Sequence, residues 1–384
     1  MSLYDRLNSE LEERVKNNAL RSLQIISDKV DFSSNDYLGY AQDADLHKVI
    51  IAEISKLRKF GSTGSRLLTG NHSLTEQLEK EVAIFHDADS ALFFNSGYEA
   101  NAGLISTITK RNDTLIFDEL CHASLREGIR LSNANSWSFK HNDLVDLELK
   151  LQKAEGEKFI VVESVYSMDG DLSPLKEIVF FAERYNANII LDEAHATGVI
   201  GKQGEGLAQN LSLHKKIFAR VHTCGKAIGN NGAFVLGNST LKNYIINFCR
   251  PFIYTTGPNL IQVIAVREAY RKLTNATELV AQLQDNCSYF KKQISRHKQI
   301  HLLPSDSAIF SVLIPGNAAV KLASIYLSNA GQDVRPILSP TVKEGAERLR
   351  ICLHSYNTKL EIDRLIKLLD QFTTFTESES ELSD

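Results

Sequence analysis

Short apolar runs of β-forming residues alternate with helix-length segments over the middle of the chain. Six such runs lie between Asp89 and Thr240: Ala91–Phe94, Thr114–Phe117, Phe159–Val162, Asn188–Leu191, Phe218–Thr223 and Ala233–Gly237. Strands that alternate with helices form parallel sheets, and the helices then cover both faces of the sheet. The pattern therefore predicts an α/β fold with a mostly parallel sheet.

The two ends of the chain follow other patterns. Leu3, Leu7, Leu11 and Val15 recur every four residues among charged residues, which predicts an amphipathic helix and not a signal peptide. After about Thr240, long helical segments precede two further strand-like runs, Ala308–Ile314 and Arg348–Leu353, as in a smaller α+β domain. We expect an N-terminal helical arm over residues 1–45, a large domain over 46–240, a smaller C-terminal domain over 241–372 and a disordered acidic tail over 373–384.

Composition narrows the class of protein. A formal net charge of −4 gives no broad attraction to nucleic acid. The five cysteines are odd in number and far apart, which argues against a disulfide framework or a thiolate zinc site and favours a reducing cytoplasm. The most apolar segment, residues 243–266, is interrupted by Arg250, Pro251 and Pro258, so we expect no membrane span.

Polar residues directly follow several of the apolar runs. They are Asn95-Ser96-Gly97, Asp118, Glu163-Ser164, Asp192 and Cys224-Gly225-Lys226. In open α/β sheets, ligands bind outside the carboxyl ends of the strands. The sequence therefore predicts that these residues meet at one large site.

The segment Asp192-Glu193-Ala194-His195 also occurs in a class of nucleic-acid helicases, but the rest of the sequence excludes a motor. An NTPase needs a G-x-x-x-x-G-K-[ST] loop before its acidic strand, whereas the pairs Gly201-Lys202 and Gly225-Lys226 lie after Asp192 and lack the hydroxyl residue. A metal site would need a third ligand such as His122 or His222, and no ligand spacing supports one, so we expect no metal. On this motif alone, Asp192 could also be a helix cap and His195 a buried structural histidine.

Lys226 favours a cofactor site. It follows a strand in glycine-rich backbone, and Asp192 ends another strand. Pyridoxal phosphate (PLP) needs a lysine amine for its covalent bond and an acid that keeps its ring nitrogen protonated. Its phosphate suits a helix amino terminus, here Gly97 and Tyr98, with a hydroxyl such as Thr223 as a further donor.

Eight motifs in order resemble the α-oxoamine synthases, PLP enzymes of fold type I, the aspartate aminotransferase-like transferases. The resemblance runs from about Asn17 to about Leu369. The motifs are FSSNDYLG (32–39), GSTGSRLLTGNH (61–72), FFNSGYEAN (93–101), CHASLREG (121–128), ESVYSMDGDLSPL (163–175), LDEAHATGVIG (191–201), HTCGKAIG (222–229) and RLRICL (348–353).

The resemblance implies roles for residues around the cofactor. Lys226 would bond the cofactor and then remove the α-proton of the amino acid, and Asp192 would pair with the ring nitrogen. His122 would stack on the ring, while His195 and Ser167 would hydrogen-bond the phenolic oxygen and the thioester carbonyl. Ser167 could instead be a turn hydroxyl, and Lys226 could instead form a structural ion pair. His141 and His222 are interpreted as structural.

The resemblance also implies substrate and subunit contacts. Arg350, assisted by Asn35, would bind the amino-acid carboxylate, with Arg348 as its rival. Arg21 would lie near the acyl substrate, although a surface arginine is an alternative. Thr255 and Thr256 would reach the phosphate from a neighbouring subunit, which implies a homodimer; an internal turn is the alternative.

Within the family, the motifs SRLLTGNH and VRPILSPTVKEGAERLRI are most similar to those of members that condense L-alanine with a pimeloyl thioester in biotin biosynthesis. The reaction releases carbon dioxide and the thiol carrier, which is coenzyme A or acyl carrier protein. The alternatives are 2-amino-3-ketobutyrate CoA ligase, 5-aminolevulinate synthase, serine palmitoyltransferase, an autoinducer synthase or a PLP-binding protein without catalysis. The segment between Arg21 and Asp31 is shorter than in many members, which puts the acyl entrance in doubt.

Overall fold

The computed structural model describes residues 2–23, 25 and 28–381 of the 384-residue chain. The chain divides into two compact units. The larger unit contains residues 35–167 and 171–283, and the smaller unit contains residues 1–34, 168–170 and 284–384. The predicted bounds of 1–45, 46–240 and 241–372 therefore need correction at both ends of the large domain.

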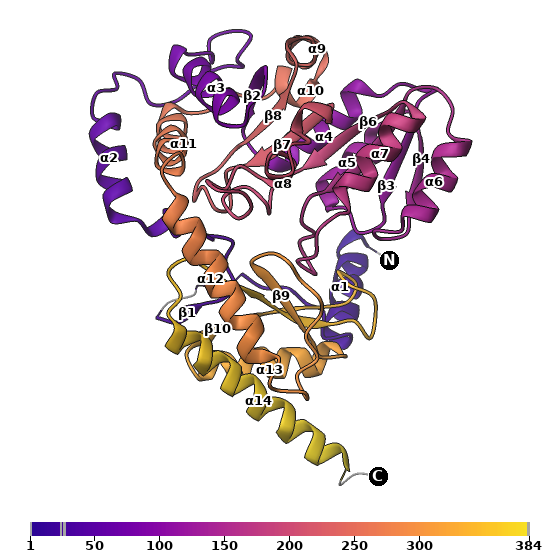
Figure 1. The fold of residues 1–384 in the computed structure, drawn as a ribbon, viewed down its shortest axis with the longest axis vertical. Helices are drawn as coiled ribbons and strands as arrows, with labels where there is room; N and C mark the ends of the chain where they lie inside the picture. Colours follow the sequence, from indigo (N-terminus) through magenta and orange to yellow (C-terminus); the bar gives the residue numbers. More distant parts are fainter. Residues whose placement is uncertain (1, 24, 26–27, 382–384) are drawn as a thin grey trace. The chain divides into compact units, whose positions relative to one another are not determined.

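A seven-stranded sheet forms the centre of the larger unit, in the order β2-β8-β7-β6-β5-β3-β4 (Figure 1). Its strands are β2 (Ser90–Phe94), β3 (Thr114–Asp118), β4 (Asn135–Phe139), β5 (Lys158–Glu163), β6 (Ala187–Asp192), β7 (Ala219–Thr223) and β8 (Ala233–Gly237). Neighbouring strands are parallel except at β8, which is antiparallel to both β2 and β7. All six predicted runs are strands of this sheet, and the α/β prediction is confirmed.

Both faces of the sheet are covered. Ile160 and Val161 are neighbours in β5, so their side chains point to opposite faces, and both are 0% exposed. On the helices, α4 (Gly97–Ile108) contacts β7 and β8, α6 (Leu144–Lys153) contacts β3 and β4, and α7 (Leu175–Tyr185) contacts β6. The remaining elements of this unit before α9 are η1 (Tyr40–Gln42), α2 (Ala44–Ile54), α3 (Ser73–Phe85), α5 (Ala123–Leu131), α8 (Leu207–Asn210) and η2 (His214–Lys216).

The sequence analysis missed strand β4. This strand lies at the end of the sheet and pairs with β3, and its residues Asn135 and Ser136 are exposed. An edge strand with a solvated surface needs few apolar residues. The run NSWSF therefore lacks the hydrophobic pattern that identified the central strands.

The larger unit continues past residue 240 because the next helices bury apolar side chains on its sheet. These helices are α9 (Ser239–Phe248), α10 (Arg250–Ile253) and α11 (Leu260–Leu273). Leu241, Ile245 and Phe252 lie in one buried cluster with Val221 and Val235 of the strands. Helix α11 packs against α2 and α3, as Figure 1 shows.

The smaller unit includes the N-terminal segment, since β1 (Val30–Asp31) pairs with β10 (Gln332–Asp333). The Cys352 N–H also donates to the Phe32 carbonyl at 2.8 Å. A three-stranded antiparallel sheet has the order β11-β12-β9, formed by Arg335–Ile337, Arg348–Cys352 and Ile309–Leu313. Its helices are α1 (Leu3–Lys16), α13 (Asn317–Asn329), α14 (Lys359–Glu381) and the carboxyl half of α12 (Thr277–Ile294).

Helix α14 enters the segment 373–384, for which disorder stays a prediction. It continues as a helix to Glu381, and residues 382–384 lie outside the described part of the chain. The earlier turns of this helix are anchored by buried side chains, those of Ile362, Leu365 and Leu369. Once a helix is formed, each added residue gains a backbone hydrogen bond, and Glu is a good helix former, so the acidic segment extends the helix.

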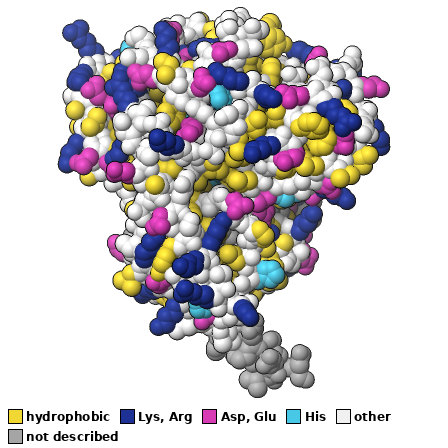
Figure 2. Space-filling view, in the orientation of Figure 1, with side chains coloured by type: hydrophobic (Ala, Val, Ile, Leu, Met, Phe, Trp, Pro, Cys, Tyr) yellow, Lys and Arg dark blue, Asp and Glu magenta, His cyan; other side chains and the backbone are white. Residues whose placement is uncertain are grey.

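The surface carries charges of both signs. On the face that Figure 2 draws, Lys and Arg side chains are interspersed with Asp and Glu. Among the described residues, none of the helices combines the length and the apolar character that a membrane crossing needs.

Candidate active site

Polar residues from neighbouring strands meet at the carboxyl edge of the large sheet, as predicted. Glu163 ends β5 and is in register with Asp192, which ends β6. The Ser164 N–H donates to the Asp192 carbonyl at 2.9 Å, and the His122 N–H donates to Glu163 Oε1 at 2.6 Å. The ends of β5 and β6 and the residue that caps α5 are thereby linked through hydrogen bonds.

Asp192 is 4% exposed, and its carboxylate accepts from two uncharged donors. Asn101 Nδ2 donates to Oδ2 at 2.7 Å, and the Ala194 N–H donates to Oδ1 at 2.8 Å. Asn101 belongs to α4 and is itself buried. A buried carboxylate held by N–H donors can face a cationic group of a ligand.

His122 caps helix α5, and its ring is only partly buried. Its Nδ1 accepts from the Ser124 N–H at 3.2 Å, which is the cap of the helix. Burial of the ring nitrogens lowers the pKa of His122, and the Lys226 ammonium lowers it further against the opposing charge of Asp192. A neutral aromatic ring is thus available for stacking at this edge of the sheet.

Glu163 is a buried carboxyl that the sequence analysis did not single out as a functional residue. It is 2% exposed, and burial raises its pKa well above the usual range, with the charge of Asp192 adding to the effect. Burial thus favours the neutral form of this carboxyl, against the His122 N–H and the Lys226 ammonium, which both act to lower its pKa.

Lys226 lies in a tight turn after β7 and is half-buried. The turn is closed by the Gly229 N–H donating to the Lys226 carbonyl at 2.7 Å and by the Asn230 N–H donating to the Cys224 carbonyl at 2.8 Å. Gly229 has a φ of +64°, and a Cβ there would lie 2.4 Å from the Ala41 nitrogen. The Lys226 ammonium acts electrostatically on both His122 and Glu163, so the structure brings the predicted lysine to the strand-end acids.

The start of α4 and Thr223 form a cradle that fits a phosphate group. A Cβ at Gly97 would lie 2.5 Å from Thr223 Cγ2. The N–H groups at the start of α4 and the Thr223 hydroxyl therefore come close together only because residue 97 is a glycine. Thr223 Oγ1 is buried and has no hydrogen-bond partner among the described residues. The first N–H groups of a helix also lack intrahelical acceptors, and Gly97 and Tyr98 supply them here.

His195 is buried and lies beside Tyr37. Its Nδ1 is 2.8 Å from the Tyr37 hydroxyl, which in turn donates to Asn35 Oδ1 at 3.1 Å. Two predicted site residues, His195 and Asn35, are therefore connected through Tyr37. The sequence analysis quoted Tyr37 within a motif but gave it no role.

Ser167 is half-buried in the loop between β5 and α7. An isolated bridge between Val165 and Leu172 closes the base of this loop. His141 bonds Asp118 at 3.0 Å and Asp171 at 2.7 Å, which fixes the loop's second arm to the end of β3. Burial opposes the charged ring, but the bonds to Asp118 and Asp171 outweigh it and raise the pKa of His141 to about 10.

Thr255 and Thr256 follow helix α10. Asn95 Nδ2 lies 3.4 Å from Thr255 Oγ1 and donates to the Thr256 carbonyl at 3.0 Å. Because Asn95 directly precedes the phosphate cradle in the chain, both threonines lie at this edge of the larger unit. Their predicted contact with a second subunit stays a prediction.

The smaller unit contains the predicted arginines. Arg350 is 9% exposed in β12 and is in register with Ser311 of β9. Arg348 forms an ion pair with Asp169 and donates through Nε to the Ala346 carbonyl at 2.8 Å. Arg21 is exposed, and its Nη2 donates to Thr341 Oγ1 at 3.1 Å.

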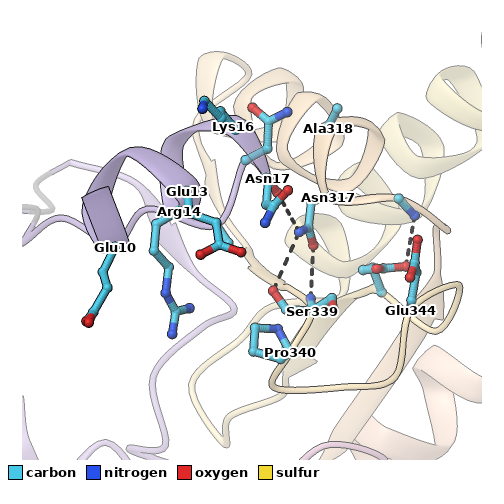
Figure 3. A pocket seen from close by; sticks show the side chains of 14 residues that line it. Glu10, Glu13, Arg14, Lys16, Asn17, Asn317, Ala318, Ser339, Pro340 and Glu344 are labelled. Carbon is cyan, nitrogen blue, oxygen red and sulfur yellow. Dashed lines mark hydrogen bonds between the residues drawn. The ribbon is translucent and has the colours of Figure 1, made fainter. Parts of the chain in front are cut away.

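A cavity of about 770 Å³ also lies in the smaller unit, between the end of α1 and the start of α13 (Figure 3). Asn317 Nδ2 donates to the Asn17 carbonyl at 2.9 Å beside it. The cavity is lined by acidic and basic side chains, including Glu10, Glu13, Glu344, Arg14 and Lys16. None of the predicted site residues lines this cavity. We assign no ligand to this cavity. Among the described residues, no group of three or more His, Cys, Asp and Glu is arranged to hold a metal ion.

Comparisons with known proteins agree with this geometry. A family model described as aminotransferase class I and II matches residues 27–369. The chain belongs to this family. An 8-amino-7-oxononanoate synthase from Lysinibacillus sphaericus is 41% identical over 337 residues, which are 87% of this chain and 86% of that protein.

Two solved structures place the chain more narrowly, among the α-oxoamine synthases. A serine palmitoyltransferase from S. paucimobilis with bound PLP has a TM-score of 0.89 at 27% identity, covering 98% of this chain and 100% of that one. An 8-amino-7-oxononanoate synthase from Francisella tularensis has a TM-score of 0.80 at 29% identity, covering 91% and 99%. The predicted fold type I is thereby confirmed.

Four residues of the site had no predicted role: Tyr37, Asn101, Ser124 and Glu163. All four lie inside motifs that the sequence analysis used. One signal was available at Asn101, because an amide within the otherwise apolar helical segment 100–105 is expected to be buried with a partner. The others are ordinary turn or strand-end residues until their neighbours in space are known.

Proposed function

We propose that the protein is an 8-amino-7-oxononanoate synthase, which condenses L-alanine with a pimeloyl thioester and releases carbon dioxide and the thiol. Its cofactor is PLP. The observation that carries the proposal is the meeting of Asp192 and Lys226 at one sheet edge beside the Gly97–Thr223 cradle. The choice of substrates rests on the 41% identity to a relative of that name.

Several side chains fit the cofactor. Lys226 would bond the cofactor aldehyde, Asp192 would face the ring nitrogen, and His122 would stack on the ring. The N–H groups of Gly97 and Tyr98 and the hydroxyl of Thr223 would hold the phosphate. When bound, PLP supplies an electron sink for both carbanion formation and decarboxylation.

The proposed proton transfers use two residues of the larger unit. The amine of Lys226 would be placed to accept the α-proton of the amino acid. The Asp192 carboxylate would hold a proton on the ring nitrogen, since a negative charge beside that nitrogen stabilises the protonated form. Hydrogen-bond donors from His195 and Ser167 would orient the phenolic and thioester oxygens and stabilise charge that develops on them.

Arg350 is the proposed partner of the substrate carboxylate, with help from Asn35. A guanidinium matches a carboxylate in a bidentate pair. Arg348, whose guanidinium pairs with Asp169, is the alternative. We also propose that Arg21 contacts the acyl substrate.

We propose a homodimer in which Thr255 and Thr256 reach the cofactor phosphate of the partner subunit. We also propose that the protein is located in the cytoplasm. The five cysteines are free in the structure, which suits a reducing compartment. The acyl carrier is either coenzyme A or an acidic carrier protein. Analytical ultracentrifugation of the cofactor-bound protein tests the dimer, since a monomer would exclude a shared site.

Two experiments test the function. Borohydride reduction followed by peptide mapping should label Lys226, and a label elsewhere or on no residue would refute the cofactor assignment. A panel of alanine, glycine and serine against acetyl, pimeloyl and palmitoyl thioesters should release thiol fastest with alanine and pimeloyl. Preference for another pair would assign a different α-oxoamine synthase activity, and thiol release with none would indicate a PLP-binding protein without catalysis.

A further inference from the structure

We propose that Asn101 and Ser124 are positioning residues that hold Asp192 and His122 in a single hydrogen-bonded row. The inference rests on the proposed function, because Asp192 and His122 are the residues proposed to contact the cofactor ring. Neither Asn101 nor Ser124 is assigned to touch the cofactor. Their role is to fix the orientation and the protonation of the two side chains that do.

The row connects two helices with one strand end. Asn101 of α4 donates through Nδ2 to Asp192 Oδ2 at 2.7 Å and to Ser124 Oγ at 3.0 Å. Ser124 Oγ is 2.8 Å from His122 Nδ1. Asn101 and Ser124 are each 1% exposed, so water does not compete for these bonds.

Close packing of α4 against α5 brings the two side chains together. A Cβ at Gly128 of α5 would lie 3.0 Å from the Asn101 carbonyl oxygen and 3.1 Å from the Ala102 Cα. Gly128 is four residues after Ser124, so both lie on the same face of α5. The missing side chain at residue 128 therefore allows Ser124 to reach Asn101.

The hydrogen atoms of the row can be assigned from its chemistry. Asn101 must present its NH₂ group, because a carbonyl oxygen placed against the Asp192 carboxylate would be repelled. Ser124 Oγ accepts one of those hydrogens and directs its own hydrogen to His122 Nδ1. Since Nδ1 also accepts from the Ser124 N–H at 3.2 Å, it carries no proton, and the neutral ring has its hydrogen on Nε2.

The arrangement leaves one polar atom unsatisfied. Asn101 Oδ1 is buried and has no partner among the described residues. Leaving a buried carbonyl without a donor destabilises the fold, and such groups call for a specific reason. Here the reason is that both amide hydrogens are committed to Ser124 and Asp192. Helix packing alone would be served better by an apolar residue.

The charged groups around the row agree with this assignment. Asp192 raises the pKa of His122, whereas burial and Lys226 lower it, and the net direction is downward. The neighbouring Glu163 accepts from the His122 N–H, and burial raises the pKa of Glu163 well above the usual range. The lowered pKa of His122 favours the neutral ring that the hydrogen bonds of the row assign.

The test compares two cofactors, PLP and an analogue in which carbon replaces the ring nitrogen. If Asn101 acts through Asp192 and that nitrogen, Asn101→Ala should weaken PLP binding by about 10- to 100-fold, as for a lost hydrogen bond to a charged group. The same variant should change the affinity for the carbon analogue by less than about 3-fold. Fluorescence titration of the cofactor-free protein measures both dissociation constants.

Matched variants separate positioning from folding. Ser106 lies on the same helix and bonds the Ala102 carbonyl, so Ser106→Ala should leave both affinities unchanged. Ser124→Ala should weaken PLP binding less than Asn101→Ala, and Ser124→Thr, which keeps the hydroxyl, should restore it. Equal losses for both cofactors, or no loss for PLP, would overturn the inference. Failure of the unmodified protein to bind PLP would instead overturn the proposed function.

Discussion

Asp118 and Asp192 are both buried aspartates at the carboxyl ends of parallel strands, yet their surroundings differ. Asp118 is 0% exposed and accepts from the Leu120 and Asn142 N–H groups and from His141. Asp192 is 4% exposed and accepts from Asn101 and the Ala194 N–H. Among the described residues, no Lys, Arg or His forms an ion pair with Asp192.

The difference separates a structural carboxylate from a binding one. A buried charge destabilises a protein unless it is paired or well hydrogen-bonded. Asp118 has its own cation, the imidazolium of His141, and the pair joins β3 to the loop that carries Ser167. Asp192 has donors that hold it in place but leave its charge available to the protonated nitrogen of a ligand.

The largest expected effect comes from Asp192→Asn. Under the proposed function, its rate of thiol release should fall by about 100- to 1,000-fold, the range for one lost electrostatic contact to a developing charge. The cofactor-free variant should be as stable as the parent or more stable, because a buried charge without its own cation has been removed. Enzyme assays and urea unfolding of the cofactor-free protein measure the two effects. A large loss of stability would show that Asp192 is structural as well.

Asp118→Asn should behave in the opposite way. It leaves the partly exposed imidazolium of His141 with one carboxylate and removes the charge that accepts from the Leu120 and Asn142 N–H groups, so the free energy of unfolding should fall by ~2 kcal/mol. Activity per folded molecule should change less than about 10-fold, since Asp118 is not proposed to touch the cofactor or substrate. Asp143→Asn is a suitable control, because Asp143 caps helix α6 and Asn caps helices equally well. If Asp118→Asn lowers the activity per folded molecule by more than about 10-fold but leaves the free energy of unfolding unchanged, the two aspartates do not differ as described.

The sequence predicted the central strands well because burial on both faces gives continuous apolar runs. It also placed Asp192 and Lys226 at the same edge of the sheet, since strand-end position and residue type are local properties. It placed the domain boundary at 240 because α9 to α11 resemble the later helices, and only their packing on Val221 and Val235 shows where they belong. It gave no role to Asn101 and Ser124 for the same reason. They are 23 residues apart, and their contact depends on the close approach of α4 and α5.

The smallest expected effect is the pH dependence of the stability that His141 contributes, and it tests whether Asp118 has a cation of its own. Because its pKa is raised from 6.5 to about 10 in the folded state, the stability that it contributes is fully present below pH 6.5 and is lost as the pH rises to about 10. The difference in unfolding free energy between the parent and His141→Gln should therefore be about 1 kcal/mol at pH 6, because solvent screens this partly exposed side chain. By pH 10 the difference should approach the value expected for a neutral imidazole ring. Urea unfolding at pH 6, 8 and 10 measures it. A difference that stays constant over this range would show that the ring is neutral, and Asp118 would then have no cation of its own.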